Sequence, residues 1–95
     1  MLISVLTGLH TQHKITDELY NRAYILVNLI KERSLEASIY LNKNNLLEFK
    51  IKSLIITFFA PEDLRCTINN EIQRLTFNRY YLIPMLDALI GENNE

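Results

Sequence analysis

Apolar residues recur every three or four positions in the first third of the chain, the spacing typical of amphipathic helices. Leu2, Val5, Leu6 and Leu9 predict a short N-terminal helix. A second helix is predicted over 16–33, where Thr16 and Asp17 offer an N-cap and two apolar stripes run side by side. These stripes are wider than one packing neighbour requires. The chain is therefore expected to share this surface with another.

Further helices are predicted downstream, after Ser34, from 46 to about 55, from Pro61 to 75, and from 85 to 90. The stretch around 49–55 fits a strand almost as well as a helix, and residues 55–59 are β-branched or aromatic, which favours extended structure. The run before Pro84 is typical of a strand or a loop. The predicted fold is thus mostly α, a helical domain of about five helices with one short extended segment near 55–60 or 76–83.

The composition supports one small domain over residues 1–95. The chain has 95 residues, of which 48% are hydrophobic, and it has only two glycines and two prolines. So few turn-forming residues argue against an all-β sandwich or barrel. A domain of this size buries too little surface to be very stable alone, so we expect a homodimer with intertwined helices.

The charges are balanced, with ten Lys and Arg against eleven Asp and Glu and a formal net charge of -1. A chain that bound DNA tightly by itself would carry a basic excess. The apolar first residues lack the basic region of a secretion signal, and the longest apolar run, 54–60, is far too short for a membrane span. We expect a cytoplasmic protein without a membrane partner, in keeping with its one unpaired cysteine, Cys66.

Residues that could carry catalysis are few and poorly arranged in the sequence. His10 and His13 with Asp17 and Glu18 could hold a metal only if all lay on one helix, and the connector between them is poorly helical. Cys66 lies inside an apolar pattern, which is typical of a packed thiol. No phosphate-binding glycine motif is present. We expect a protein that is not an enzyme and that has no metal and no cofactor.

The aromatic and apolar side chains that exceed the needs of a small core are the candidates for a dimer or partner interface. The alternative is that all of them pack inside one core. The candidate interface residues are Leu19, Tyr20, Tyr24, Val27, Phe49, Phe58, Phe59, Tyr80 and Tyr81.

The order of several short motifs resembles a known family. Ile15-Thr16-Asp17 is followed by Tyr24 and then by Leu29-Ile30. A predicted helix led by Ala37, an Asn-containing break, a proline-started helix at Pro61 and the aromatic-Arg pattern of Phe77, Arg79 and Tyr80 follow in turn. From about 15 to 86 this order is similar to the FlhD subunit of the FlhD–FlhC flagellar regulators, a family with relatives on conjugative mobile elements. Cys66 lies one helix earlier than the family's inter-subunit cysteine, and the C-terminal region is shorter.

The resemblance implies an all-α homodimer that acts as a non-catalytic subunit of a transcriptional activator. Such a subunit binds promoter DNA together with a zinc-containing FlhC-like partner and recruits RNA polymerase. The candidate phosphate contacts are Arg22, Arg33, Arg65, Arg74 and Arg79. The alternative function is a small phage- or plasmid-encoded inhibitor or chaperone that binds a host protein.

Overall fold

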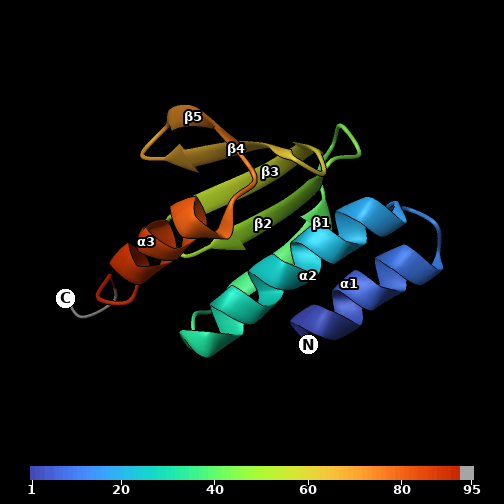
Figure 1. Ribbon diagram of the computed structural model, residues 1–95, viewed down its shortest axis with the longest axis horizontal. Coiled ribbons are helices and arrows are strands. Elements are labelled where there is room, and N and C mark those ends of the chain that lie inside the picture. The colour runs from blue at the N-terminus through green and yellow to red at the C-terminus, as the bar shows by residue number, and fades with distance from the viewer. Residues whose placement is uncertain (93–95) are drawn as a thin grey trace.

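The computed structural model describes residues 1–92 as three helices and one antiparallel sheet (Figure 1). Two helices come first, five strands follow, and one helix ends the described chain. In chain order the elements are α1 (Leu2–Thr11), α2 (Asp17–Glu32), β1 (Ala37–Leu41), β2 (Leu47–Ile51), β3 (Leu54–Ala60), β4 (Asp63–Ile68), β5 (Glu71–Thr76) and α3 (Arg79–Leu89).

The sheet is a simple meander in which every strand pairs with the next one along the chain, in the order β1-β2-β3-β4-β5. Alternate side chains of the central strands, such as Phe49, Ile56 and Leu64, are fully buried in the same core cluster as α2 residues such as Leu26. The helices therefore pack on one face of the sheet, and the opposite face is open to solvent. Helices α1 and α2 lie side by side at the β1 end of the sheet (Figure 1).

The core is dominated by aliphatic and aromatic side chains from both layers. Phe49 and Phe58 are essentially inaccessible, and their ring centroids lie 5.9 Å apart. Phe77, in the connector before α3, extends the aromatic contact to Phe58 at 6.1 Å. From α1, Leu6 is fully buried, so this short helix is held by packing rather than by its own propensity.

The two N-terminal helices confirm the prediction from apolar periodicity. Helix α2 begins after Thr16, whose hydroxyl accepts a hydrogen bond from the Leu19 amide at 3.1 Å. It ends in a Schellman motif, in which the amides of Ser34 and Leu35 donate to the carbonyls of Lys31 and Ile30. A helix near the C-terminal end is also confirmed, but it begins at Arg79 and contains Pro84. The strand or loop expected over 76–83 is therefore wrong from Arg79 onward, whereas Thr76 ends a strand and residues 77–78 are a loop.

The all-helical fold is wrong between residues 35 and 76. The helices predicted after Ser34, from 46 to 55 and from Pro61 to 75 are replaced by strands, and Pro61 lies in the turn between β3 and β4. The extended segment expected near 55–60 is confirmed as part of β3. The physical reason is strict alternation: Leu47, Phe49 and Ile51 are buried and the residues between them are not, which only a strand permits. An intertwined all-α dimer is therefore not the architecture of this chain.

The turns are made without glycine. Six residues other than glycine have positive φ angles within the described chain, and no glycine does. Asn69 and Asn70, with φ of 53° and 67°, form the two-residue turn between β4 and β5, a geometry that asparagine tolerates better than most residues. Because the usual glycine signals are missing, these turns were not evident in the composition.

Candidate functional site

The open face of the sheet presents two straight rows of side chains, each with one residue from every strand. The strand register places Tyr40, Glu48, Thr57, Arg65 and Arg74 in one row. Ser38, Lys50, Ile55, Thr67 and Ile72 form the second row. In β1 to β4 both rows alternate with the buried positions of the same strands, and β5 continues the rows at the edge of the sheet, so they form one continuous surface. This surface is the candidate functional site.

Glu48 lies at the centre of a hydrogen-bond cluster in the first row. Its carboxylate accepts hydrogen bonds from the Tyr40 hydroxyl at 2.8 Å, the Thr57 hydroxyl at 2.8 Å and the Asn42 side-chain amide at 3.0 Å. Partial burial by itself would raise the pKa of Glu48, but these three donors outweigh it and lower the pKa. Burial, followed by the hydrogen bond to Glu48 and the charge of its carboxylate, raises the pKa of the Tyr40 hydroxyl.

The other end of the row combines arginines with an exposed aromatic ring. The guanidinium carbon of Arg65 lies 4.2 Å from the centroid of the Phe59 ring, which is half-exposed. Asp63 accepts a hydrogen bond from Arg65 at 2.8 Å and a longer one from Arg74 at 3.4 Å. One carboxylate thus serves two guanidinium groups. The side chain of Arg74 remains 73% exposed and is available to a partner.

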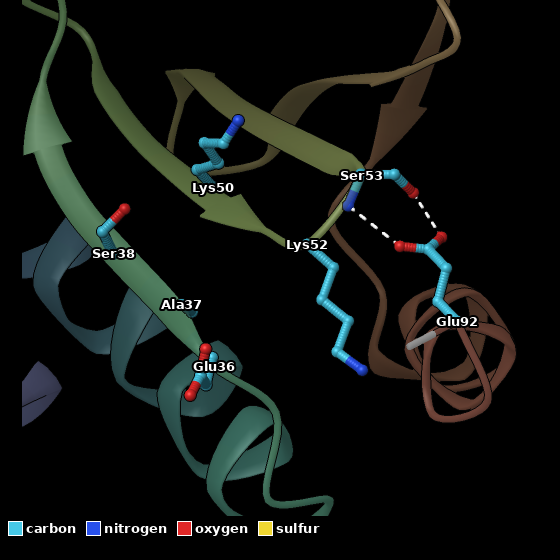
Figure 2. Close-up of a pocket in the computed structure, with 7 residues that line it drawn as sticks. All are labelled: Glu36, Ala37, Ser38, Lys50, Lys52, Ser53 and Glu92. Atoms are coloured by element: carbon cyan, nitrogen blue, oxygen red, sulfur yellow. Dashed lines mark hydrogen bonds between the residues drawn. The ribbon is translucent and has the colours of Figure 1, made fainter. Parts of the chain in front are cut away.

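A shallow depression of about 560 Å³ lies at the turn between β2 and β3 (Figure 2). Glu92 accepts hydrogen bonds there from the amide and the hydroxyl of Ser53, and the Lys52 ammonium donates to the Leu89 carbonyl at 3.2 Å. Figure 2 shows the side chains of Lys50 and Lys52 pointing in opposite directions. These hydrogen bonds attach the end of the described chain to the β2–β3 turn. The two lysine ammonium groups do not converge, so the depression is not arranged as a binding site for an anion.

The five arginines expected to contact DNA do not form one surface. Arg22 on α2 lies 5.8 Å from the Phe77 ring centroid, and Arg33 at the end of α2 hydrogen-bonds Asp87. Arg65 and Arg74 are neighbours on the open face, and Arg79 begins α3. The structure brings only Arg65 and Arg74 together, and Asp63 lies between them.

The expected interface residues divide into a core group and an exposed group. Val27, Phe49 and Phe58 are buried in the core, and Leu19 and Tyr20 are half-buried against it. Tyr24 is about one-third exposed, and Phe59, Tyr80 and Tyr81 are at least half-exposed. Of the exposed group, Phe59 is the one that belongs to the open face, because Arg65 of that face covers its ring.

The histidines and the cysteine occupy structural positions. His10 Nε2 lies 2.6 Å from a carboxylate oxygen of Asp17, and the imidazole stacks on Tyr20 with centroids 4.2 Å apart. His13 has φ of 60° and ends α1 in a second Schellman motif. Burial raises the pKa of the Cys66 thiol to about 11. Within residues 1–92, no three His, Cys, Asp or Glu side chains are grouped so that they could hold a metal ion.

Comparison with known proteins assigns no family to the chain: no family model, curated protein or solved structure matches it. Among the helices of the described chain, none is long and apolar enough to cross a membrane. The positions that carried the FlhD-like resemblance are partly on strands. Ala37 begins β1, and Pro61 precedes β4, where the resemblance implied helices.

The helices predicted from the sequence conceal the open face, because they place its residues on helical turns and not on strands. Glu48 and Lys50 alternate with buried residues of β2, and this alternation was the available signal for a face of polar side chains. The pairing of Arg65 with Arg74 had no local signal, because it depends on the turn at Asn69 and Asn70.

Proposed function

We propose that this chain is a non-catalytic protein-binding domain that docks a partner protein on the open face of its sheet, around Phe59. The observation that carries the proposal is the half-exposed Phe59 ring stacked against Arg65, with the exposed Arg74 in the next strand. Aromatic residues and arginine are the types that most often anchor protein interfaces. Of the two functions expected from the sequence, this one corresponds to an inhibitor or chaperone that binds another protein.

Two ionisable side chains, Glu48 and Cys66, are held in states that are poorly suited to catalysis, and this supports a binding function. The Glu48 carboxylate is held ionised by three hydrogen bonds, which makes it a weak base and a poor proton donor near neutral pH. The Cys66 thiol is buried and its pKa is raised, which makes it a poor nucleophile.

The chemistry of the partner follows from the charges around Phe59. Arg65 and Arg74 share the carboxylate of Asp63, and Glu62 lies beside Arg74, but the side chain of Arg74 remains largely exposed and accessible to a partner. A partner with an apolar pocket for Phe59 and an acidic side chain opposite Arg74 matches this surface.

The proposal is tested by replacing Phe59 with a photo-crosslinking amino acid in cells of the source organism and identifying the proteins that become attached. The matched control carries it at Tyr80, which is 75% exposed on α3. We expect a discrete protein adduct from position 59 alone. With the identified partner purified, Phe59→Ala and Arg74→Glu each weaken binding at least about tenfold, the size expected for interface anchors, and Tyr80→Ala changes it less than about twofold.

Equal adducts from both positions, or identical affinities for all three variants, contradict the proposal. The promoter-binding hypothesis stays a prediction, and the cells that carry the photo-crosslinking amino acid at position 59 also test it. If position 59 crosslinks to DNA when the product of an adjacent gene is present, and that complex shifts promoter DNA in a salt-sensitive manner, the activator function is favoured instead.

A further inference from the structure

The free edge of β1 differs from the free edge of β5 in its charge. The sheet ends at β1 on one side and at β5 on the other. Strand β5 carries Glu71 and Arg74, and charges of this kind protect an edge strand from pairing with other chains. Strand β1 has the sequence ASIYL and carries no charge. The β1 edge therefore lacks the protection that the β5 edge has.

The strand register shows which backbone groups of β1 lack a partner. The Asn42 amide donates to the Leu46 carbonyl at 2.9 Å, which makes this pair a hydrogen-bonded one. Hydrogen-bonded pairs alternate along antiparallel strands, so Tyr40 and Ser38 also bond to β2. The amides and carbonyls of Ala37, Ile39 and Leu41 then point away from β2, and no hydrogen bond to them is made within the described chain.

An apolar groove of about 500 Å³ runs along this edge. One wall is the first turn of α1, with Met1, Leu2 and Val5, and the other is β1, with Ala37 and Ile39. Val5, which lines this groove, is 45% exposed. The groove thus combines unpaired backbone groups with apolar walls, the two features that recognise an added β-strand.

We propose that the β1 edge binds an extended segment of a partner protein, which adds to the sheet as a sixth, antiparallel strand beneath α1. Residues of the segment that hydrogen-bond Ala37, Ile39 and Leu41 place their side chains on the helix side of the sheet, so these residues are small or aliphatic. Glu36 precedes β1 and Lys43 follows it. A segment with an acidic residue before the strand and a basic residue after it complements these charges.

A second copy of this chain fits the edge less well than a lone strand. Two β1 strands paired around a two-fold axis would lie roughly 5 Å apart, the spacing of neighbouring strands. Helix α1 borders β1 in each copy, and the two α1 helices would then need to share the space above the axis. Because packed helices need roughly 8–10 Å between their axes, a segment without its own α1 is the better occupant.

The probe for the test is the peptide Asp-Val-Thr-Val-Thr-Val-Lys, in which valines are designed to face α1. Backbone amide exchange is measured on the whole protein with and without peptide. We expect peptide to protect the amides of Ala37, Ile39 and Leu41, and to leave those of Ile72, Arg74 and Thr76 at the β5 edge exchanging as before. The amides of Ser38 and Tyr40 are protected in both states, which shows that β1 stays folded.

Two methylated peptides distinguish strand addition from adsorption to the groove. N-methylation of the three valines removes the amides that face β1, whereas N-methylation of the two threonines leaves them intact. We expect the first peptide to bind at least about tenfold more weakly than the second, since it loses the backbone hydrogen bonds of the pairing. Equal binding of the two methylated peptides overturns the proposal.

Two protein variants test whether the peptide binds at the β1 edge. Val5→Lys introduces a charge into the groove wall and is expected to weaken binding at least about tenfold, whereas Ile72→Lys at the β5 edge leaves it unchanged. No protection of Ala37, Ile39 and Leu41 at millimolar peptide overturns the proposal. The proposal is also overturned if the same amides become protected without peptide when the protein is concentrated and its mass doubles. That result would identify the β1 edge as a contact between two copies of the chain. The inference is independent of the open face, because Val5 lines the groove beside β1 and Phe59 contacts Arg65 on the open face, so Val5→Lys is expected to leave crosslinking from Phe59 unchanged.

Discussion

Arg33 Nε donates a 2.6 Å hydrogen bond to Asp87 Oδ1 and so joins the end of α2 to α3 across 54 positions of sequence. The same guanidinium donates to the Leu29 carbonyl at 3.0 Å, in the last turn of α2. Its side chain is only 15% exposed. Arg33, expected from the sequence to contact DNA, therefore has a structural role between two helices.

Replacing Arg33 by alanine is expected to lower the free energy of unfolding by about 1 kcal/mol, because the hydrogen bonds to the Leu29 carbonyl and to the half-exposed carboxylate of Asp87 are both lost. Arg79→Ala, at an exposed position on α3, is the matched control and should change stability by less than about 0.5 kcal/mol. Urea denaturation of the purified variants measures both. Equal effects of the two substitutions would contradict this role for Arg33.

Ser34 ends α2 in a left-handed conformation, with φ of 52°. Glycine adopts this conformation without the steric cost that a Cβ imposes. Ser34→Gly is therefore expected to raise the free energy of unfolding by about 1 kcal/mol. The same chemical change at Ser4, inside α1, is the control and should lower stability by a few tenths of a kcal/mol. Thermal denaturation compares the two, and a loss of stability at both positions would exclude strain at Ser34.

The sequence predicted the helices correctly where a helical period and a cap agreed. In α2, Thr16 supplies the cap and the apolar stripes from Leu19 to Ile30 supply the period. Downstream, Leu64, Ile68, Ile72 and Leu75 also have helical spacing, yet they belong to two strands. The turn that separates these strands consists of Asn69 and Asn70, which do not carry the usual glycine signal. Periodicity alone could not decide between the two structures there.

The candidate site depends on strand pairing more than on local pattern. Arg65, Arg74 and Phe59 were each recognised from the sequence, but for different functions. Their convergence arises because β4 lies between β3 and β5, and because the strand register shifts between Phe58 and Ala60. Long-range pairing of this kind has no signature in a single sequence without recognised turns.

Cys66 is expected to resist thiol reagents in the folded protein. Its side chain is 2% exposed, and burial raises the pKa of the thiol to about 11, so only about a thousandth of it is thiolate at pH 8. Modification at pH 8 should therefore be slow and should accelerate with denaturant. A Ser53→Cys, Cys66→Ala protein provides an exposed thiol for comparison. If Cys66 reacts as fast as the cysteine introduced at position 53, the buried position is incorrect.

Glu48 predicts how the stability of the fold depends on pH. Partial burial opposes ionisation of its carboxyl, but hydrogen bonds from Asn42, Tyr40 and Thr57 lower the pKa below the value of 4.5 expected for a free side chain. Because the folded-state pKa is the lower one, the stabilisation is fully present above the unfolded-state pKa and is lost as pH falls through the folded-state pKa. Glu48→Gln should therefore cost the most stability near neutral pH, and the difference from the wild type should shrink below about pH 4.

Denaturation at a series of pH values measures this difference, and NMR titration of the Glu48 carboxyl follows its pKa directly. Tyr40→Phe removes one donor and should move the Glu48 pKa upward, towards its ordinary value. Glu71→Gln, at the exposed start of β5, changes the net charge equally and serves as the control. A difference between wild type and Glu48→Gln that is constant from pH 3 to 7 would mean that the carboxylate does not contribute through these hydrogen bonds.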